Sequence, residues 1–154
     1  MSTERSPAKA ELRMRDKQQA AERAAELVQS GMIVGLGTGS TTIFATRGIG
    51  RLLQDGLLKD IVGFATSKAV WEEAVRLGIA MMPEEMPHVI NLAIDDADEV
   101  DGDLNLIKGA GGALVREKIV AQAETWTTIV ARGRSCGCPL EERYGELPAR
   151  FGGQ

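Results

Sequence analysis

The hydrophobic and polar residues near the start of the chain repeat with the period of an α-helix. Between residues 11 and 30, apolar side chains recur every three to four positions, as they do along the buried side of a helix. Gly31 follows directly, and glycine is a common helix-ending residue. A short apolar run over 32–36 comes next, which is typical of a buried strand in a parallel sheet. The pattern therefore predicts a helix over 11–30 and then a strand over 32–36.

The same succession of periodic stretches and short apolar runs continues along the chain. Thr66 and Ser67 form an N-cap pair before one of the periodic stretches. Alternation of strands with helices implies βαβ units, so we expect an α/β fold: a Rossmann-like, open and mostly parallel sheet with helices on both faces. The further predicted strands are 61–65, 79–81, 89–94 and 127–131, and the further predicted helices are 43–53, 68–77 and 113–123.

A change of composition near residue 131 divides the chain. All predicted elements lie within residues 1–131, whereas residues 132–154 hold five glycines and two prolines and show no periodic apolar pattern. We therefore expect a folded core over 1–131 and an irregular tail over 132–154. The total of 154 residues fits a single domain.

Charge and composition narrow the class of partner and the location. The chain has 18 Lys and Arg against 22 Asp and Glu, a net charge of −4, which argues against nucleic acid as the main partner. No apolar run approaches the roughly 18 residues of a membrane span, and the start has no signal-peptide pattern. His88 is the only histidine, and Cys136 and Cys138 are one residue apart, which argues against a structural zinc site and a disulfide framework. We expect a cytoplasmic protein that binds neither nucleic acid nor membranes.

A glycine turn over 37–42 separates the strand predicted over 32–36 from the next helix. Backbone N–H groups in such a turn, with a helix N-terminus behind them, suit a phosphate or a carboxylate. The turn lacks the Gly-Lys-Ser/Thr of a Walker loop, and glycines at 35, 37 and 39 do not fit the G-x-G-x-x-G dinucleotide fingerprint. We favour an anion site here, with a plain tight turn as the alternative.

An acidic segment over 95–103 follows the strand predicted over 89–94. Eight Asp and Glu residues and no Lys or Arg lie between Met81 and Asp103. Open α/β sheets bind ligands at the carboxyl ends of their strands, where we expect this segment to form a turn. Repulsion among crowded carboxylates favours a raised pKa in at least one of them, as proton transfer requires. A metal site is one alternative, although the spacing fails the EF-hand pattern, and a solvated acidic loop is another.

A second glycine loop over 108–112 precedes the helix predicted over 113–123. Its glycines permit close approach of the backbone to a ligand, and Lys108 places a cation beside the acidic segment. Glu117 follows near the start of the helix, where its carboxylate has access to the same cleft. An ordinary charged helix face is the alternative for residues 116–118.

Three stretches of the sequence together resemble the ribose-5-phosphate isomerase A family. They are Val34–Thr41, Asp95–Asp101 and Lys108–Ile119, and they occur in the order and spacing of that family. The resemblance spans about residues 11–131. It implies interconversion of D-ribose 5-phosphate and D-ribulose 5-phosphate through an enediolate, in the non-oxidative pentose phosphate pathway. It also implies a homodimer that uses no metal and no cofactor.

The resemblance further implies a role for each matching residue. Glu117 matches the general base that moves a proton between C2 and C1. Asp95 and Asp98 match carboxylates that handle hydroxyl protons and ring opening, and Lys108 matches the cation near the developing oxyanion. The substrate-binding positions that it implies are Lys17, Thr38, Gly39, Ser40, Thr41, Asp96, Ala97, Gly109, Ala110 and Gly111.

The chain departs from the family pattern at several places. Asp96 and Ala110 stand where the family usually has glycine, and Arg132–Ser135 replaces a segment whose lysine contacts phosphate. The family's small α+β domain is missing after residue 131, as in a truncated or frameshifted chain, so we expect impaired activity. A non-catalytic sugar-phosphate sensor on the same scaffold is the alternative function. The retained proton carriers favour the enzyme.

Overall fold

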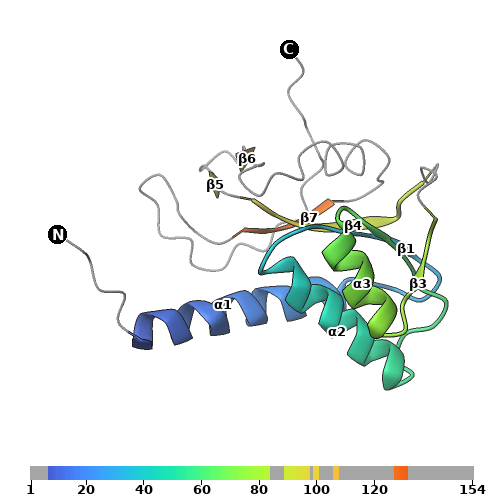
Figure 1. Ribbon diagram of the computed structural model, residues 1–154, viewed down its shortest axis with the longest axis horizontal. Coiled ribbons are helices and arrows are strands. Elements are labelled where there is room, and N and C mark those ends of the chain that lie inside the picture. Colours follow the sequence, from blue (N-terminus) through green and yellow to red (C-terminus); the bar gives the residue numbers. More distant parts are fainter. Residues whose placement is uncertain (1–6, 84–88, 98, 101–105, 108–126, 132–154) are drawn as a thin grey trace, which may run out of the picture.

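The computed structural model describes residues 7–83, 89–97, 99–100, 106–107 and 127–131 (Figure 1). Helices and strands alternate in it as the sequence predicts. The described helices are α1 (Pro7–Glu26), α2 (Thr42–Gln54) and α3 (Lys68–Arg76). The described strands are β1 (Ile33–Leu36), β2 (Val62–Ala65), β3 (Ala80–Met81), β4 (Leu92–Ala97), β5 (Glu99–Val100), β6 (Leu106–Ile107) and β7 (Thr127–Ala131).

A parallel sheet with the strand order β3-β2-β1-β4-β7 forms the centre of the molecule. Val34 of β1 lies between Gly63 of β2 and Leu92 of β4. The chain runs from β1 outward to β3 and then returns to the other side of β1 as β4. This reversal makes the β1–β4 junction the topological switch point, where open α/β sheets bind ligands at the carboxyl ends of the strands. The expected open, parallel α/β fold is confirmed.

All three described helices lie together on one face of the sheet (Figure 1). The crossovers β1-α2-β2 and β2-α3-β3 advance in the same direction along the sheet, and right-handed crossovers then place both helices on the same side. The helix predicted over 113–123 lies outside the described residues, so helices on the second face of the sheet stay a prediction. None of the described helices has an apolar stretch that would reach across a lipid bilayer.

The main core lies between these helices and the sheet. Val34 and Leu36 of β1 and Ile94 of β4 are at most 2% exposed and belong to one cluster with alanines of α1 and α2. Small residues bring those two helices close together, because a Cβ added at Gly48 would lie 3.1 Å from the Cβ of Ala25. The second half of α1 is thereby fixed beside α2, directly below the central strands.

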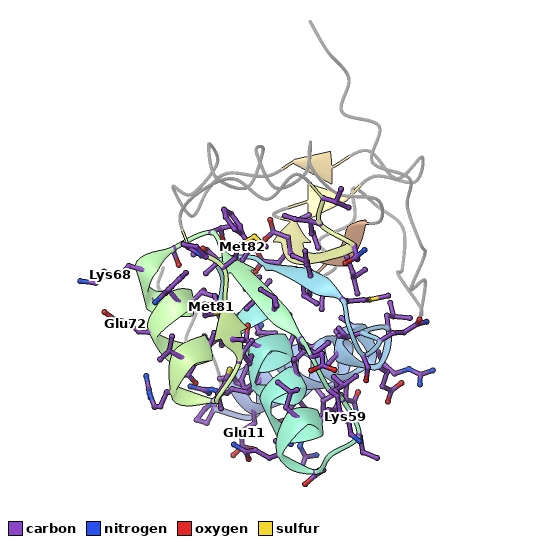
Figure 2. All side chains as sticks on the ribbon, turned by 90° about the vertical axis from the view of Figure 1, so that its right-hand side faces the viewer. Glu11, Lys59, Lys68, Glu72, Met81 and Met82 are labelled. Atoms are coloured by element: carbon purple, nitrogen blue, oxygen red, sulfur yellow. The ribbon has the colours of Figure 1, made fainter. Side chains whose placement is uncertain are left out.

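Charged side chains join α2 to α3 on the outer side of the helix layer. The carboxylate of Glu73 is buried, accepts a hydrogen bond from Arg47 Nε at 2.6 Å, and lies 2.9 Å from Arg76 Nη2. The hydrogen bond from Arg47 holds the pKa of Glu73 below its ordinary value. By contrast, Lys68 and Glu72, whose charged atoms are 3.7 Å apart, project from α3 into solvent (Figure 2).

The helix predicted over 11–30 is displaced toward the amino terminus, since α1 ends at Glu26. Gly31 does not end the helix. It lies in the loop before β1 with a φ of +83°, and its N–H donates to Lys59 O at 3.0 Å. Leu27 and Val28 continue the apolar period beyond the helix, which explains why the pattern places the end too late.

The strand predicted over 89–94 is wrong at both ends, since β4 runs over Leu92–Ala97. Before the strand, Asn91 accepts a hydrogen bond from Ile33 N through Oδ1 at 2.7 Å and donates from its own N–H to Ile33 O at 2.9 Å. At the far end, β7 pairs with β4 as far as Ala97 opposite Ala131. Pairing with β7 keeps the acidic residues of β4 extended.

The acidic turn predicted over 95–103 is therefore wrong at its start. Asp95 and Asp96 belong to β4, where Asp95 lies opposite Ile129 of β7. Beyond them, β5 pairs with β6 as two antiparallel strands, with Glu99 opposite Ile107. Carboxylates are poor strand formers on their own, but pairing with a neighbouring strand overrides that preference.

Candidate active site

The glycine turn after β1 lies at the switch point of the sheet, beside the end of β4. The N–H of Gly37 donates to Ile94 O at 2.9 Å and thereby joins the turn to β4. Gly39 O accepts from Ile43 N at 3.2 Å and from Thr42 Oγ1 at 3.1 Å. These bonds place the start of α2 directly behind the turn, which is the strand-turn-helix arrangement expected for an anion site.

The turn approaches the acidic end of β4 so closely that two of its positions have no room for a side chain. A Cβ at Gly37 would lie 2.6 Å from Asp95 Cγ and 2.8 Å from Ile94 O. At Gly39 it would lie 2.8 Å from Asp96 Cγ. Ordinary Cβ contacts are longer than this, and the Ile94 carbonyl is backbone that cannot rotate away. Glycine is therefore required at position 37 by the Ile94 carbonyl, whereas a side chain at position 39 would force the carboxylate of Asp96 to move.

Asp95 is held in a fixed position against the turn. The residue is 8% exposed, and its Oδ1 accepts a hydrogen bond from Asp96 N at 2.8 Å. Asp96 is half-buried and faces Gly39. A fixed carboxylate that is partly withdrawn from water has the placement that proton exchange with a bound ligand requires.

Lys17 brings a cation from α1 to the same turn. Its Nζ donates to Ser40 Oγ at 2.5 Å. Because α1 passes below the central strands, a residue far away in the sequence reaches the glycine turn. An ammonium group beside a helix N-terminus adds to the positive end of the helix dipole, so both favour an anion at this place.

The N-terminus of α2 differs from that of α3 in how it is capped. Ser67 caps α3 with its hydroxyl oxygen, which accepts from Val70 N at 3.4 Å. Thr41, the N-cap of α2, makes no such side-chain hydrogen bond. The first N–H groups of a helix have no partner within the helix. At α2 backbone carbonyls take the place of a side-chain cap, since the N–H of Ile43 donates to Gly39 O at 3.2 Å and that of Phe44 to Thr41 O at 3.1 Å.

Thr66 is a member of the site that the sequence analysis assigns only to helix capping. Its Oγ1 lies 2.7 Å from Thr38 Oγ1 and donates to Leu36 O at 3.2 Å. It is 2% exposed and follows the last residue of β2, next to the end of β1. The sequence signals were its place directly after a predicted strand, at the edge where ligands bind, and the resemblance of the Thr66-Ser67 pair to the family.

The structure brings together only part of the predicted site. Lys17, the turn residues 38–41, Asp95 and Asp96 meet at the β1–β4 junction, and Ala97 is buried in β4 opposite Ala131. Among the described residues, no group of three or more His, Cys, Asp or Glu side chains gathers in a way that would hold a metal ion. The predicted site residues outside the described part are Asp98, Lys108, Gly109, Ala110, Gly111 and Glu117.

The fold and the site define a class of protein. An open parallel sheet with a glycine turn, a cation and carboxylates at its switch point is typical of α/β proteins that bind a small anionic ligand. The family described as ribose 5-phosphate isomerase A (phosphoriboisomerase A) matches residues 62–148. The chain belongs to this family. The matched range continues past residue 131, so the boundary expected there stays a prediction.

Individual relatives and solved structures agree with this assignment. The ribose-5-phosphate isomerase A of Desulfatibacillum aliphaticivorans is 56% identical over 114 residues, which are 74% of this chain and 50% of the relative. The solved ribose 5-phosphate isomerase of Plasmodium falciparum is 40% identical with a TM-score of 0.72, covering 82% of this chain and 56% of that one. A D-ribose-5-phosphate isomerase in complex with phospho-erythronic acid is 38% identical with a TM-score of 0.71, covering 75% and 50%. This chain spans about half the length of these proteins.

Proposed function

We propose that this chain carries the sugar-phosphate site of an aldose–ketose isomerase that interconverts D-ribose 5-phosphate and D-ribulose 5-phosphate, a reaction of the non-oxidative pentose phosphate pathway. The observation that carries the proposal is the β1–β4 junction, where the glycine turn, Lys17 and Asp95 meet in a member of this family. A cation and a helix N-terminus suit a phosphate, and an adjacent fixed carboxylate suits the hydroxyl protons of a sugar.

In the proposed reaction the protein moves one proton between neighbouring carbons of the open-chain sugar. Glu117 removes the proton from C2, the electron pair of that bond forms the C1–C2 double bond, and O1 takes a proton from Asp95 or Asp98. Glu117 then returns the proton to C1, and the hydroxyl at C2 gives its proton back to the carboxylate that protonated O1 as the ketone forms. Lys108 stabilises the negative charge that develops on oxygen. The sugar is oxidised at C2 and reduced at C1, so no external oxidant is consumed.

The phosphate supplies binding energy away from the reacting carbons. Lys17, Ser40 and the N-terminus of α2 are the groups that we propose to hold it. Binding energy from such a remote group orients C1 and C2 toward the carboxylates, which favours reaction over binding alone.

Replacing Glu117 tests the proposed reaction. Glu117→Gln keeps the shape of the side chain but removes the base, so we expect turnover of ribose 5-phosphate to fall by at least about 100-fold, with little change in its affinity. Turnover is measured as ribulose 5-phosphate formed, and affinity by calorimetric titration. Glu72→Gln on the exposed side of α3 is the matched control and should leave both values unchanged.

Two results would contradict the reaction as proposed. Near-normal turnover in Glu117→Gln would remove Glu117 from the role of base. A wild-type chain that binds ribose 5-phosphate without converting it would fit the non-catalytic sensor instead.

We further propose that the protein acts as a cytoplasmic homodimer with no nucleic-acid partner. The net charge of −4 disfavours a polyanion. Leu12 and Met14 on α1 are 59% and 51% exposed, which supports contact with a second copy. Light scattering decides the oligomeric state, and the mass of a single chain would contradict the dimer.

A further inference from the structure

Thr66 and Thr38 form a pair of hydroxyl groups below the glycine turn. Thr66 is 2% exposed, and its N–H and Oγ1 both donate to Leu36 O, at 3.0 and 3.2 Å. Its Oγ1 also lies 2.7 Å from the Oγ1 of Thr38, which is half-buried in the turn. Thr66 therefore contacts both the end of β1 and a side chain of the site.

Counting protons fixes the direction of the hydrogen bond between the two hydroxyls. A threonine hydroxyl has one proton, and a carbonyl oxygen only accepts. If the proton of Thr66 points to Leu36 O, Thr38 donates to Thr66, and both contacts are hydrogen bonds. If instead the proton of Thr66 points to Thr38, two oxygen atoms face each other 3.2 Å apart with no proton between them. Only the first arrangement makes every one of these contacts a hydrogen bond, whereas in the second Leu36 O accepts from Thr66 N alone.

This direction determines what Thr38 offers to a ligand. Its only proton is used toward Thr66, so Thr38 Oγ1 presents lone pairs alone. Lone pairs accept a hydrogen bond from a sugar hydroxyl, but they repel phosphate oxygens, which carry the negative charge and accept hydrogen bonds themselves.

We propose that Thr66 is a positioning residue that fixes Thr38 as an acceptor, so that Thr38 binds a hydroxyl of the sugar and not the phosphate. The inference rests on the proposed function for its choice of ligand. It divides the turn by chemistry: Lys17, Ser40 and the start of α2 bind the anion, and Thr38 binds the carbohydrate.

The test compares two ligands, ribose 5-phosphate and inorganic phosphate, by calorimetric titration. Thr66→Val keeps the shape of the side chain but removes its hydroxyl. The hydroxyl of Thr38 then has no acceptor at position 66, so its proton rotates to another direction. We expect affinity for ribose 5-phosphate to fall about tenfold, the effect of one hydrogen bond between neutral groups, and affinity for inorganic phosphate to stay within about twofold. Thr66→Ser restores the hydroxyl and should bind both ligands as the wild type does.

Thr46→Val is the matched control. Thr46 is 1% exposed, and its hydroxyl donates to a backbone carbonyl, Thr42 O, at 3.1 Å inside α2. The same substitution there removes one buried hydroxyl without touching Thr38. Both affinities should remain unchanged, even if the two variants lose similar stability.

A double-mutant cycle with Thr38→Val shows whether Thr66 acts through Thr38. If it does, adding Thr66→Val to Thr38→Val changes ribose 5-phosphate affinity no further, whereas independent roles would give additive losses. Additive losses, or an equal loss of both ligands in Thr66→Val, would overturn the proposal. Should Thr66→Val fail to fold, Thr38→Val alone must weaken ribose 5-phosphate and spare inorganic phosphate, and any other pattern overturns it. These measurements report affinity and not turnover. A wild-type chain that binds ribose 5-phosphate without isomerising it would therefore contradict the proposed reaction, but the test of Thr66 would still be valid.

Discussion

Asp96 places a second carboxylate against the turn in which we expect the phosphate. Its Cγ would lie 2.8 Å from a Cβ at Gly39, so the charge is next to the backbone of the anion site. Two unit charges about 4 Å apart interact by about 1 kcal/mol even at the dielectric constant of water. The negative charge of Asp96 therefore opposes the attraction that Lys17 and the α2 N-terminus supply.

Neutralising this residue should strengthen anion binding. We expect Asp96→Asn, which keeps the size of the side chain, to bind inorganic phosphate about fivefold more tightly in a calorimetric titration. Asp55→Asn, at the opposite end of α2, removes the same charge far from the turn and should change affinity little. Unchanged or weaker binding in Asp96→Asn would show that this carboxylate does not act on the anion by repulsion.

Single residues also show which parts of the site a sequence reveals. The glycine turn and Asp95 were predictable, because each directly follows or ends an apolar strand and the ends of parallel strands meet at one edge. The role of Thr66 was not predictable. It depends on Thr38 Oγ1 lying 2.7 Å away across two neighbouring strands, and 28 residues of sequence separate the two.

At the scale of elements, α2 and α3 depend on the buried carboxylate of Glu73. Arg47 and Arg76 both contact it, and the hydrogen bond from Arg47 keeps its pKa below the ordinary value. A carboxylate whose pKa is lower in the folded state stabilises the fold fully above its unfolded pKa, about 4.3 for glutamate. As the pH falls from that value through the folded pKa, the unfolded chain binds the proton first and the stabilisation is lost.

Glu73→Gln should therefore reduce both stability and its dependence on pH. We expect a loss of about 1.5–3 kcal/mol at pH 7, the usual contribution of a hydrogen bond to a charged group, and a smaller further loss between pH 5 and about pH 3 than in the wild type. Urea unfolding at several pH values measures both quantities. Glu72→Gln, whose side chain is 60% exposed, should cost less than about 1 kcal/mol. Parallel pH curves for the wild type and Glu73→Gln would contradict the role of this carboxylate.

The elements themselves were easier to predict than their ends. The alternation of strands and helices can be predicted from the spacing of hydrophobic residues alone. The ends of β4, by contrast, are set by contacts with residues elsewhere in the chain. Asn91 binds both backbone groups of Ile33 before the strand, and pairing with β7 extends it through Asp95 and Asp96. Neither contact is visible in the local sequence.

At the scale of the whole molecule, side chains are buried much more deeply in the central strands than at the start of α1. The central strands β1 and β4 carry Val34, Leu36 and Ile94, each at most 2% exposed. At the other extreme, the first half of α1 carries Leu12 and Met14, more than half exposed, and Figure 1 shows that end of the helix extending away from the described strands. The central strands should therefore open only when the whole fold unfolds, and the start of α1 should open locally in a chain that no second copy covers there.

Amide hydrogen exchange measures this difference residue by residue. We expect amides in β1 and β4 to exchange at least about 1,000-fold more slowly than those over 10–17 of α1, because a marginally stable domain still unfolds globally at a cost of about 5 kcal/mol. Amides in the second half of α1, which packs on α2, serve as an internal comparison and should be intermediate or slow. Equal exchange rates along α1 would mean that its first half is as stable as the core.

The close contact of Gly37 and Gly39 with two carboxylates also restricts how the site can be redesigned. A mutational library that randomises these two positions should return glycine almost exclusively at position 37, whichever ligand is used for selection, because a first side-chain atom there collides with the Ile94 carbonyl. At position 39 another residue requires the Asp96 carboxylate to move, so glycine should still be preferred there. Altered ligand preference must then come from neighbouring positions with room to vary, such as the half-buried Thr38 and the exposed Ser40. Descendants of this chain would diversify there while Gly37 stays unchanged.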